Sequence, residues 1–447
     1  MTAAVLAANV DERDRLATEF AQVAATLPGR RAGWLQRLRE KALDRFSAQG
    51  LPTTRHEEWK YTNVAALAKR PYAVGVAAAP SSAVDVAPFT FAGLAPHLAV
   101  FVDGRFAPGL SRLGALPAGC TLGSLATVLD DDPDALQRAL ADDRAHTVFS
   151  ALNTAFTADG LYLHLRRGVA LDAPVHALFL ATRDDVVAHP RNVIVAEGGA
   201  QALVVEHHAA AGGASYFTNA ITQVYADANA AVTHVKLQQE GARAFHVAGL
   251  HASQARASRF ESQSIAFGAA LSRADITTAF DDEGCEAHLS GLYLAAGRQH
   301  VDHHTRIDHA MPHGTSREYF KGVLDDGARG VFNGKVIVHP GAQKTDAHLA
   351  NHNLLLSKSA EVDTKPELRI DADDVKCSHG ATVGQLDETA LFYLRSRAID
   401  AGTARALLTY AFAHDVIERI RLAPLRAALE QVLFARLPQG ERLRELA

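Results

Sequence analysis

The fold is indicated by the stretch Ala231-Val232-Thr233-His234-Val235-Lys236-Leu237, in which apolar and polar side chains alternate. The same alternation recurs at residues 202–207 and 334–339. A period of two residues is typical of a β-strand that buries one face. From about residue 95 to about residue 375, roughly fifteen or more short strands of this kind are expected to follow one another.

The spacing of these strands favours one architecture over its competitors. A doubly wound α/β fold needs a helix after nearly every strand, and long amphipathic helices are missing between these strands. An immunoglobulin-like sandwich places about seven strands in about 100 residues. A β-solenoid accommodates a longer series best, because each coil buries its face on the next coil. Without a crisp sequence period, a large sandwich or barrel stays open on pattern alone.

Helical periodicity marks both ends of the chain. Leu16, Phe20 and Leu27 recur at helical spacing near the N-terminus, and Asp387 is placed to cap the first of several C-terminal helices. The predicted architecture is therefore mainly β, with helical terminal regions around a β-solenoid core. The predicted parts are an N-terminal helical region at 1–75, a core at 76–385 and a C-terminal helical domain at 386–447.

Composition narrows the class of function. The 447 residues include 45 Lys and Arg, 50 Asp and Glu and 3 Cys, and the formal net charge is −5. Mixed charge of this kind argues against a dedicated nucleic-acid or membrane binder, and three cysteines cannot form a disulfide scaffold. No run of about 18 apolar residues is present, and the N-terminus lacks the basic region of a secretory signal. A cytoplasmic protein is expected.

Motifs for nucleotide hydrolysis and for nucleophilic catalysis are missing from the sequence. The run Gly341-Ala342-Gln343-Lys344-Thr345 superficially resembles the end of a P-loop, but Gln343 stands where a glycine must let backbone amides wrap phosphates. Neither G-x-G-x-x-G after a strand nor a G-x-S-x-G elbow occurs. The chain is not expected to bind ATP by a known loop.

Cys377 and His379 are the best candidate metal ligands. Residues two apart in a strand project from the same face, so the thiol and the imidazole would lie side by side as soft ligands for iron or zinc. Two ligands do not close a site, because a tetrahedral metal needs four, or three and an open position. Either the pair is structural, which spacing alone favours, or other ligands come from elsewhere. Cys120 is far away in sequence, and Cys285 is expected to be a buried apolar cysteine.

A group of histidines near residue 300 is a second candidate for metal binding. These residues lie in strand-like sequence and need not share a face, so solvated or turn histidines are favoured over metal capture. Asp302 and Asp308 would suit iron better than copper if a metal were held there. The group comprises His300, His303, His304, His309 and His313.

Two acidic segments offer a rival enzyme class, a β-solenoid hydrolase or lyase acting on carbohydrate. They are Asp281-Asp282-Glu283 and Asp371-Ala372-Asp373-Asp374. Nothing in the sequence places two of these carboxylates at catalytic separation. Aromatic platforms for sugars are also sparse, since Phe, Trp and Tyr make up 7% of the chain.

One resemblance covers roughly residues 315–400 densely. Its segments are Ser316-Arg317-Glu318-Tyr319-Phe320-Lys321-Gly322-Val323, Gly330-Val331-Phe332-Asn333-Gly334-Lys335-Val336, Ala342-Gln343-Lys344-Thr345-Asp346-Ala347, Asn351-His352-Asn353-Leu354-Leu355-Leu356-Ser357, Thr364-Lys365-Pro366-Glu367-Leu368 and Asp373-Asp374-Val375-Lys376-Cys377-Ser378-His379-Gly380-Ala381-Thr382-Val383-Gly384. Together with Leu391-Phe392-Tyr393-Leu394-Arg395-Ser396-Arg397, they resemble the SufB/SufD family of iron–sulfur cluster assembly proteins.

Within that family the chain is more similar to the SufD type. The motif Arg55-His56-Glu57-Glu58-Trp59-Lys60-Tyr61-Thr62 fits that type, as do Leu394 and Ser396, and the cysteine-rich N-terminal stretch of SufB-type chains is absent. Ala398 departs from the family, which generally has glycine there, and a slightly altered helix end is expected. Residues 95–300 match weakly.

The resemblance implies a fold and a role. Such proteins have a right-handed parallel β-helix between helical terminal regions, pair with a SufB-like paralogue through the β-helix, and bind a SufC-like ATPase through the C-terminal helical domain. Cys377 and His379 match family positions at the paralogue interface, where they would share a transient site for iron or a nascent iron–sulfur cluster. No stably bound cofactor is expected in the isolated chain, and ATP hydrolysis would belong to the partner.

Three roles stay open at this point. The chain is expected to be a non-catalytic assembly scaffold that helps iron entry and cluster formation. The alternatives are a purely structural subunit with an inert Cys377–His379 pair, and the independent carbohydrate-active enzyme. Edges that pair with a paralogue could also pair with themselves, which would make the isolated chain a homodimer.

Overall fold

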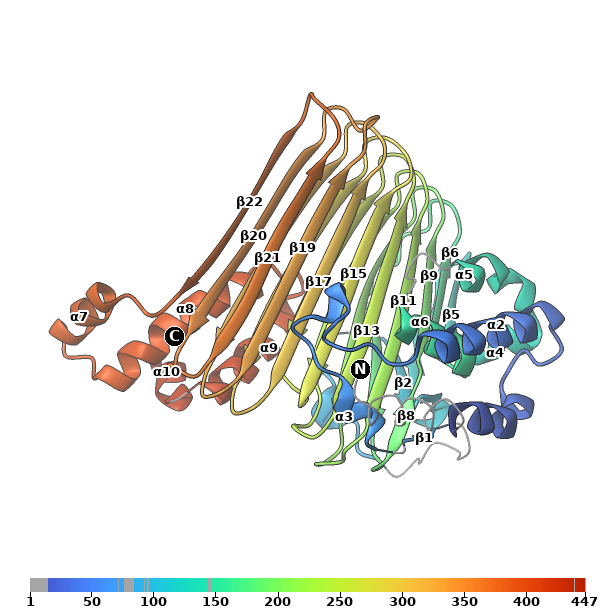
Figure 1. Ribbon diagram of the computed structural model, residues 1–447, viewed down its shortest axis with the longest axis horizontal. Coiled ribbons are helices and arrows are strands. Elements are labelled where there is room, and N and C mark those ends of the chain that lie inside the picture. The colour runs from blue at the N-terminus through green and yellow to red at the C-terminus, as the bar shows by residue number, and fades with distance from the viewer. Residues whose placement is uncertain are drawn as a thin grey trace.

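The computed structural model describes residues 15–70, 72–75, 84–91, 93–94, 96–142, 147–437 and 439–446. Within these residues the chain is mainly β and forms a parallel solenoid of about 8 turns, with helices at both ends of the chain (Figure 1). The predicted architecture is confirmed. The predicted boundary after residue 75 adjoins residues 76–83, which lie outside the described residues.

Successive coils contribute strands alternately to two sheets, each 11-stranded within the described residues. The first sheet contains β1 (Ala73–Val74), β5 (Cys120–Ser124), β6 (Leu161–Leu165), β8 (Val186–Ala188), β9 (Arg191–Ala196), β11 (Phe217–Ala226), β13 (Phe245–Gln254), β15 (Leu271–Phe280), β17 (His300–His309), β19 (Arg329–Val338) and β21 (Glu361–Ile370). The second sheet contains β2 (His97–Val102), β3 (Arg105–Phe106), β4 (Arg112–Leu113), β7 (Val175–Ala181), β10 (Gln201–Ala210), β12 (Ala231–Gln239), β14 (Arg259–Ala266), β16 (Glu286–Ala295), β18 (Thr315–Leu324), β20 (Asp346–Leu355) and β22 (Lys376–Gly384). From β9 and β10 onward, neighbours in each sheet pair in parallel and in register.

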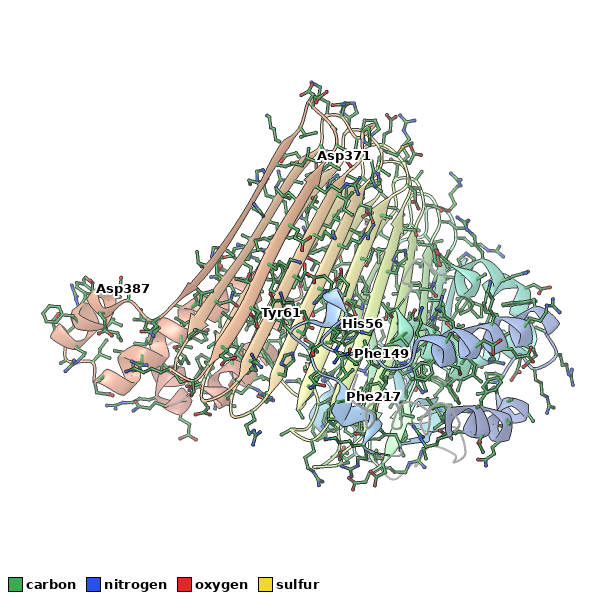
Figure 2. All side chains as sticks on the ribbon, viewed as in Figure 1. His56, Tyr61, Phe149, Phe217, Asp371 and Asp387 are labelled. Atoms are coloured by element: carbon green, nitrogen blue, oxygen red, sulfur yellow. The ribbon has the colours of Figure 1, made fainter. Side chains whose placement is uncertain are left out.

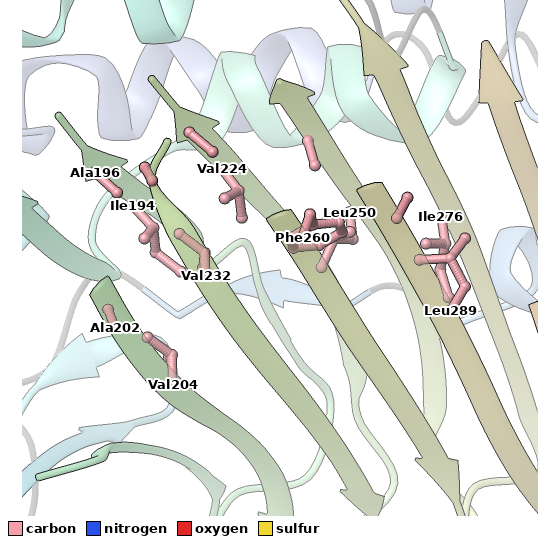
Figure 3. Close-up of a cluster of buried hydrophobic side chains, with 14 of the residues drawn as sticks. Ile194, Ala196, Ala202, Val204, Val224, Val232, Leu250, Phe260, Ile276 and Leu289 are labelled. Atoms are coloured by element: carbon pink, nitrogen blue, oxygen red, sulfur yellow. The ribbon is translucent and has the colours of Figure 1, made fainter. Parts of the chain in front are cut away.

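The core lies between the two sheets, where every second side chain of each strand points inward. Figure 3 shows Val232 and Phe260 from the second sheet close to Val224 and Leu250 from the first. The parallel register places like positions above one another, so that Val232 stacks on Phe260. Burial in such stacks stabilises the fold by roughly 25 cal/mol per Å² of apolar surface removed from water. Residues 231–237 do not bury one face alone, as the alternation predicted: Val232 lies in this core, whereas Val235 and Leu237 are buried on the outer face of the sheet.

A polar network interrupts this apolar interior at β10 and β12. The Glu206 carboxylate is 2% exposed and accepts hydrogen bonds from His208 Nε2 at 2.7 Å, His234 Nε2 at 3.0 Å and Thr222 Oγ1 at 2.5 Å. The Lys236 ammonium lies 3.5 Å from Glu206 Oε1. Burial alone would raise the pKa of Glu206, but Lys236 and the two histidines together hold it well below its usual value. Glu206 is therefore a buried, compensated carboxylate that links three strands.

Helices cover the outer faces of the sheets. The helices are α2 (Gly33–Gln49), α3 (Ala65–Ala68), α4 (Leu125–Asp131), α5 (Gln137–Ala141), α6 (Val148–Phe156), α7 (Glu388–Ser396), α8 (Ala401–Ile417), α9 (Ala423–Arg436) and α10 (Gly440–Leu446), and residues 15–23 are also helical. Phe149 of α6 packs against Phe217 on the first sheet, and both are labelled in Figure 2. Leu429 and other apolar residues of α8–α10 pack against Ile265 and its neighbours on the second sheet. The two helical regions thus lie on opposite faces of the solenoid.

The C-terminal helices begin where the sequence predicted. The Asp387 carboxylate accepts a hydrogen bond from Thr389 N at 2.8 Å and caps α7. Ala398, just past the end of α7, has a φ of 66°, the left-handed conformation that a glycine adopts without strain. No described helix is long and apolar enough to cross a membrane.

Candidate metal site at the end of the solenoid

The last coil of the solenoid leaves two strands at the sheet edges. β21 ends the first sheet and β22 ends the second, and in the described part of the chain no strand pairs with the outer edge of either one. Figure 1 shows β22 as the outermost strand of its sheet, before the chain turns into α7. An edge of this kind presents unpaired backbone N–H and C=O groups to solvent or to another chain.

Cys377 and His379 both lie on β22. Their register partners on β20 are Ala347 and Leu349. Cys377 is half-buried and packs against the apolar interior together with Leu368, whereas His379 is exposed. Because the side chains of a strand alternate, His379 projects to the same side as Cys377. The two side chains are therefore expected to share the inward side of β22, at the open end of the interior.

The chemistry of Cys377 follows from its partial burial. Burial raises the pKa of the Cys377 thiol above its ordinary value, although a backbone hydrogen bond at Ala347 opposes the rise. The thiol is therefore protonated at neutral pH, and a metal ion must displace its proton on binding. His379 offers an imidazole nitrogen as a second donor.

A complete metal site is not formed by the described residues, among which no group of three or more His, Cys, Asp or Glu side chains could hold an ion. Cys120 lies on β5, at the opposite end of the first sheet. Cys285 is buried, as predicted, and its thiol donates to Ala255 O and Asp282 O, both at 3.2 Å. Any further donors to a metal at Cys377 and His379 must come from outside these residues.

Four of the five histidines near residue 300 are buried or paired rather than solvated, so the favoured prediction was wrong for them, whereas His313 is an exposed turn residue as predicted. His303 and His309 point into the core and bond to Ser264 and Ser316 at 3.0 and 2.9 Å. Residues at an odd separation on β17 face opposite sides, so His300 and His304 point outward instead. The group therefore does not converge on one point.

The outward-pointing His300 and His304 contact a segment from the N-terminal part of the chain. The motif at residues 55–62, where Figure 2 labels His56 and Tyr61, crosses the outer face of the first sheet. Thr62 Oγ1 lies 2.9 Å from His300 Nε2 and donates to Asp302 Oδ2 at 2.5 Å. Arg273 stacks on the Trp59 ring at 3.7 Å and pairs with Asp302 at 2.9 Å. These residues fasten the N-terminal segment to β15 and β17, a role that no local sequence pattern signals.

The two acidic segments do not come together. Both lie in loops that join the first sheet to the second, and Glu283 pairs with Arg256 while Asp374 pairs with Lys344. Backbone hydrogen bonds step from one loop to the next at Gly284, His313 and Lys344, so three coils separate Glu283 from Asp374. At about 4.8 Å per strand spacing this is roughly 14 Å, beyond the separation of glycosidase carboxylates.

Comparison with known proteins identifies the family to which this solenoid belongs. Residues 179–412 match the SufBD core domain of the SUF system for FeS cluster assembly, and residues 11–177 match the SufBD protein N-terminal region. The chain belongs to the SufBD family.

Relatives of known name match the chain over most of its length. An iron–sulfur cluster assembly SufBD family protein of Synechocystis is 34% identical over 459 residues, which cover 98% of this chain and 100% of that protein. The iron–sulfur cluster assembly protein SufD of Escherichia coli is 34% identical over 412 residues, or 90% of this chain and 93% of SufD. SufD of Bacillus subtilis is 27% identical over 286 residues, or 64% of this chain and 65% of that protein. The chain is thus a SufD homologue of the SUF system, and the SufBD core match runs from within β7 to within α8.

Proposed function

We propose that this SufBD family protein is a SufD-like scaffold subunit that pairs with a SufB-like paralogue and a SufC-like ATPase and shares a transient iron or iron–sulfur site with the paralogue. The observation that carries the proposal is the placement of Cys377 and His379 on an unpaired edge strand. Two soft donors beside a free edge are half of a site that a second chain can complete.

The open end of the solenoid supports pairing with another solenoid. Among the residues that the structure describes, β21 and β22 each leave one backbone edge unpaired, and exposed apolar side chains accompany them, Ile370 at 42% and Val383 at 49% exposure. A paralogue with the same strand spacing can extend both sheets by backbone hydrogen bonds. Such contact would bury Cys377 and bring donors of the partner toward it. A second copy of this chain could use the same edges in the absence of the paralogue.

Helix α7 supports the attachment of an ATPase. It exposes Phe392 at 72% and Tyr393 at 55%, whereas the apolar side chains of α8 and α9 are buried against the second sheet. Adjacent exposed aromatic residues are the kind that dominate protein interfaces. The sequence lacks an ATP-binding loop of its own, so the energy of ATP hydrolysis would enter through such a contact.

Loss of either metal donor should reduce the iron held by the complex. Cys377→Ser and His379→Ala are each expected to lower the affinity for iron by about tenfold or more, because each removes one of few ligands. The complex itself should still assemble, since the edge backbone is untouched. Iron recovered per complex, after co-purification with SufB-like and SufC-like proteins, measures this.

Cys120→Ser is the matched control, because Cys120 lies at the far end of the first sheet and should not change iron recovery. Normal iron content in the double variant Cys377→Ser/His379→Ala would leave a purely structural subunit. Failure of the wild-type chain to co-purify with either partner would refute the scaffold role altogether.

Truncating the aromatic pair on α7 should weaken the ATPase contact. Phe392→Ala/Tyr393→Ala is expected to reduce ATPase affinity by about 100-fold, the loss typical of two interface anchors. The stability of the isolated chain should change little, because both side chains are exposed. Titration calorimetry with the ATPase tests this. Met311→Ala, at an exposed apolar residue on the loop after β17, is the control that should retain full affinity.

A further inference from the structure

A row of side chains connects the C-terminal helices to the strand that carries Cys377 and His379. It starts at Asp415 on α8, whose carboxylate accepts a hydrogen bond from Tyr319 Oη at 2.6 Å. The same carboxylate lies 2.7 Å from the Lys321 ammonium. Tyr319 and Lys321 are outward-facing residues of β18, so this carboxylate joins the helical domain to the second sheet.

Neighbouring contacts make this joint stiff. Lys321 Nζ also donates to Phe412 O at 3.1 Å and lies 4.5 Å from the centre of the Phe412 ring. The Arg419 guanidinium stacks on the Tyr319 ring at 4.1 Å. Lys321 is 8% exposed, so its end of the pair is shielded from water, although the Asp415 side chain is 40% exposed. A shift of α8 would therefore carry the Tyr319 ring with it.

The row continues from β18 across β20 to β22. The His352 ring meets the Tyr319 ring edge to face, with centroids 5.7 Å apart. On its other side, His352 Nδ1 lies 2.8 Å from Thr382 Oγ1, within hydrogen-bond distance. His352 and Thr382 are also register partners in the ladder between β20 and β22. Thr382 is three residues from His379, or about 10 Å along the strand.

β22 depends on such contacts more than the interior strands of its sheet do. Its backbone is hydrogen-bonded along one edge only, and most of its side chains are exposed. Its outward residues are held by two bonds to β20, from Thr382 to His352 and from Ser378 to His348. Of these two histidines, His352 is the one that contacts Tyr319.

We propose that His352 is a positioning residue that couples the C-terminal helical domain to β22, so that movement of α8 is transmitted through Tyr319 and His352 to Thr382 and the metal-donor strand. The mechanical coupling is a property of this chain alone. Its use in iron loading rests on the proposed function, in which α7 receives an ATPase and β22 receives iron.

Amide hydrogen exchange on the full-length chain tests the coupling directly. Asp415→Asn and Thr382→Val should each accelerate exchange of the β22 amides by about threefold or more, and the double variant should exchange no faster than the faster single variant. Non-additivity of this kind is expected because either change already interrupts the same row. Acceleration factors that multiply in the double variant would overturn the coupling.

The neighbouring bond supplies a matched control. Ser378→Ala removes the contact with His348, and its effect on β22 exchange should multiply with that of Asp415→Asn. His352→Phe keeps a ring for Tyr319 but loses the bond to Thr382, whereas His352→Asn keeps a polar atom for Thr382 but loses the ring. Both should abolish the coupling, and retention of the coupling in His352→Phe would reduce His352 to a packing role.

Titration of His352 gives an independent readout. Burial and the Lys321 ammonium lower the pKa of His352, while Asp415 raises it. Nuclear magnetic resonance should therefore show a downward shift in the pKa of His352 in Asp415→Asn and an upward shift in Lys321→Met. If the pKa of His352 is the same in both variants as in the wild-type chain, the contact between the helical domain and this ring is contradicted.

The role in iron loading is tested in the assembled complex with Fe²⁺. Thr382→Val should reduce the increase in bound iron on ATP addition by about threefold or more, without changing the ATPase rate. An undiminished ATP-dependent increase would overturn this role. Failure of the partners to assemble would instead refute the proposed function, and the exchange result on the isolated chain would be unaffected by it.

Discussion

Glu206→Gln is expected to lower the free energy of unfolding by about 3–5 kcal/mol, because it leaves a buried ammonium without its counter-charge. In the native chain the Lys236 ammonium is 10% exposed and lies 3.5 Å from the Glu206 carboxylate. The amide also replaces an acceptor that serves His208, His234 and Thr222. The midpoint of urea unfolding, followed by circular dichroism, measures the loss.

Two further variants show whether the uncompensated charge causes this loss of stability. Glu286→Gln changes a strand glutamate whose side chain is 41% exposed and whose pair with Arg259 is at the surface, so its cost should stay below about 1 kcal/mol. Glu206→Gln/Lys236→Met removes both charges and should recover much of the lost stability. If the double variant is as unstable as the sum of the two single variants, the uncompensated charge is not the cause.

Acidification from pH 7.5 to 5.5 is expected to destabilise the fold by roughly 3 kcal/mol, chiefly through buried neutral histidines. Burial lowers the pKa of His176, His246, His303 and His309 to about 4 and that of His189 to about 3. An unfolded histidine takes up a proton below about pH 6.5, whereas these folded ones stay neutral. The contribution of these five histidines to stability is therefore present above about pH 6.5 and is lost as the pH falls toward their folded pKa values.

Glu318 and His304 oppose this loss. Burial raises the pKa of Glu318 to about 7, so its protonation adds stability as the pH falls from 7 to the ordinary glutamate value. Burial alone would lower the pKa of His304, but Asp302 raises it to about 9, and its charged form adds stability as the pH falls from 9 to 6.5. Each fully shifted group contributes about 1.4 kcal/mol per pH unit, so five histidines outweigh these two groups.

The free energy of urea unfolding, measured as a function of pH, tests the balance between the neutral histidines and the groups that oppose them. His309→Gln should flatten the acid loss, because one neutral histidine no longer contributes to it. Glu318→Gln should steepen the loss, because an opposing group is removed. A wild-type profile that is flat or rises between pH 7.5 and 5.5 would contradict the assignment of these histidines as buried and neutral.

Much of the fold could be predicted, because its rules are local. The alternation around Val232 and Val235 indicated a strand, and each coil repeats a strand of this kind, although the two side chains lie on opposite faces of β12 and both are buried. The helix that starts after Asp387 carries its own cap. Even the pairing of Cys377 with His379 on one face follows from two-residue spacing in a strand. These patterns do not specify the order in which the strands stack.

The misread residues are those whose partners are distant in sequence. His300 and His304 looked solvated because nothing near them indicated that Thr62 and Glu58 would lie above the same strand. No local pattern indicated that Glu206 points inward and is balanced by Lys236. The contacts of His352 with Tyr319 and Thr382 likewise depend on the register of three strands.

The sequence by itself determined the alternation of buried and exposed positions, the helical ends and the segments that mark the SufBD family. These depend on backbone geometry and on side chains a few residues apart, which short stretches of sequence specify. Only the tertiary structure decided that β22 is an unpaired edge and that α8 is joined to it through His352. It also decided that a charged network lies inside the solenoid. Those features arise from parallel stacking, which brings residues about thirty positions apart into contact and leaves the last coil without a neighbour.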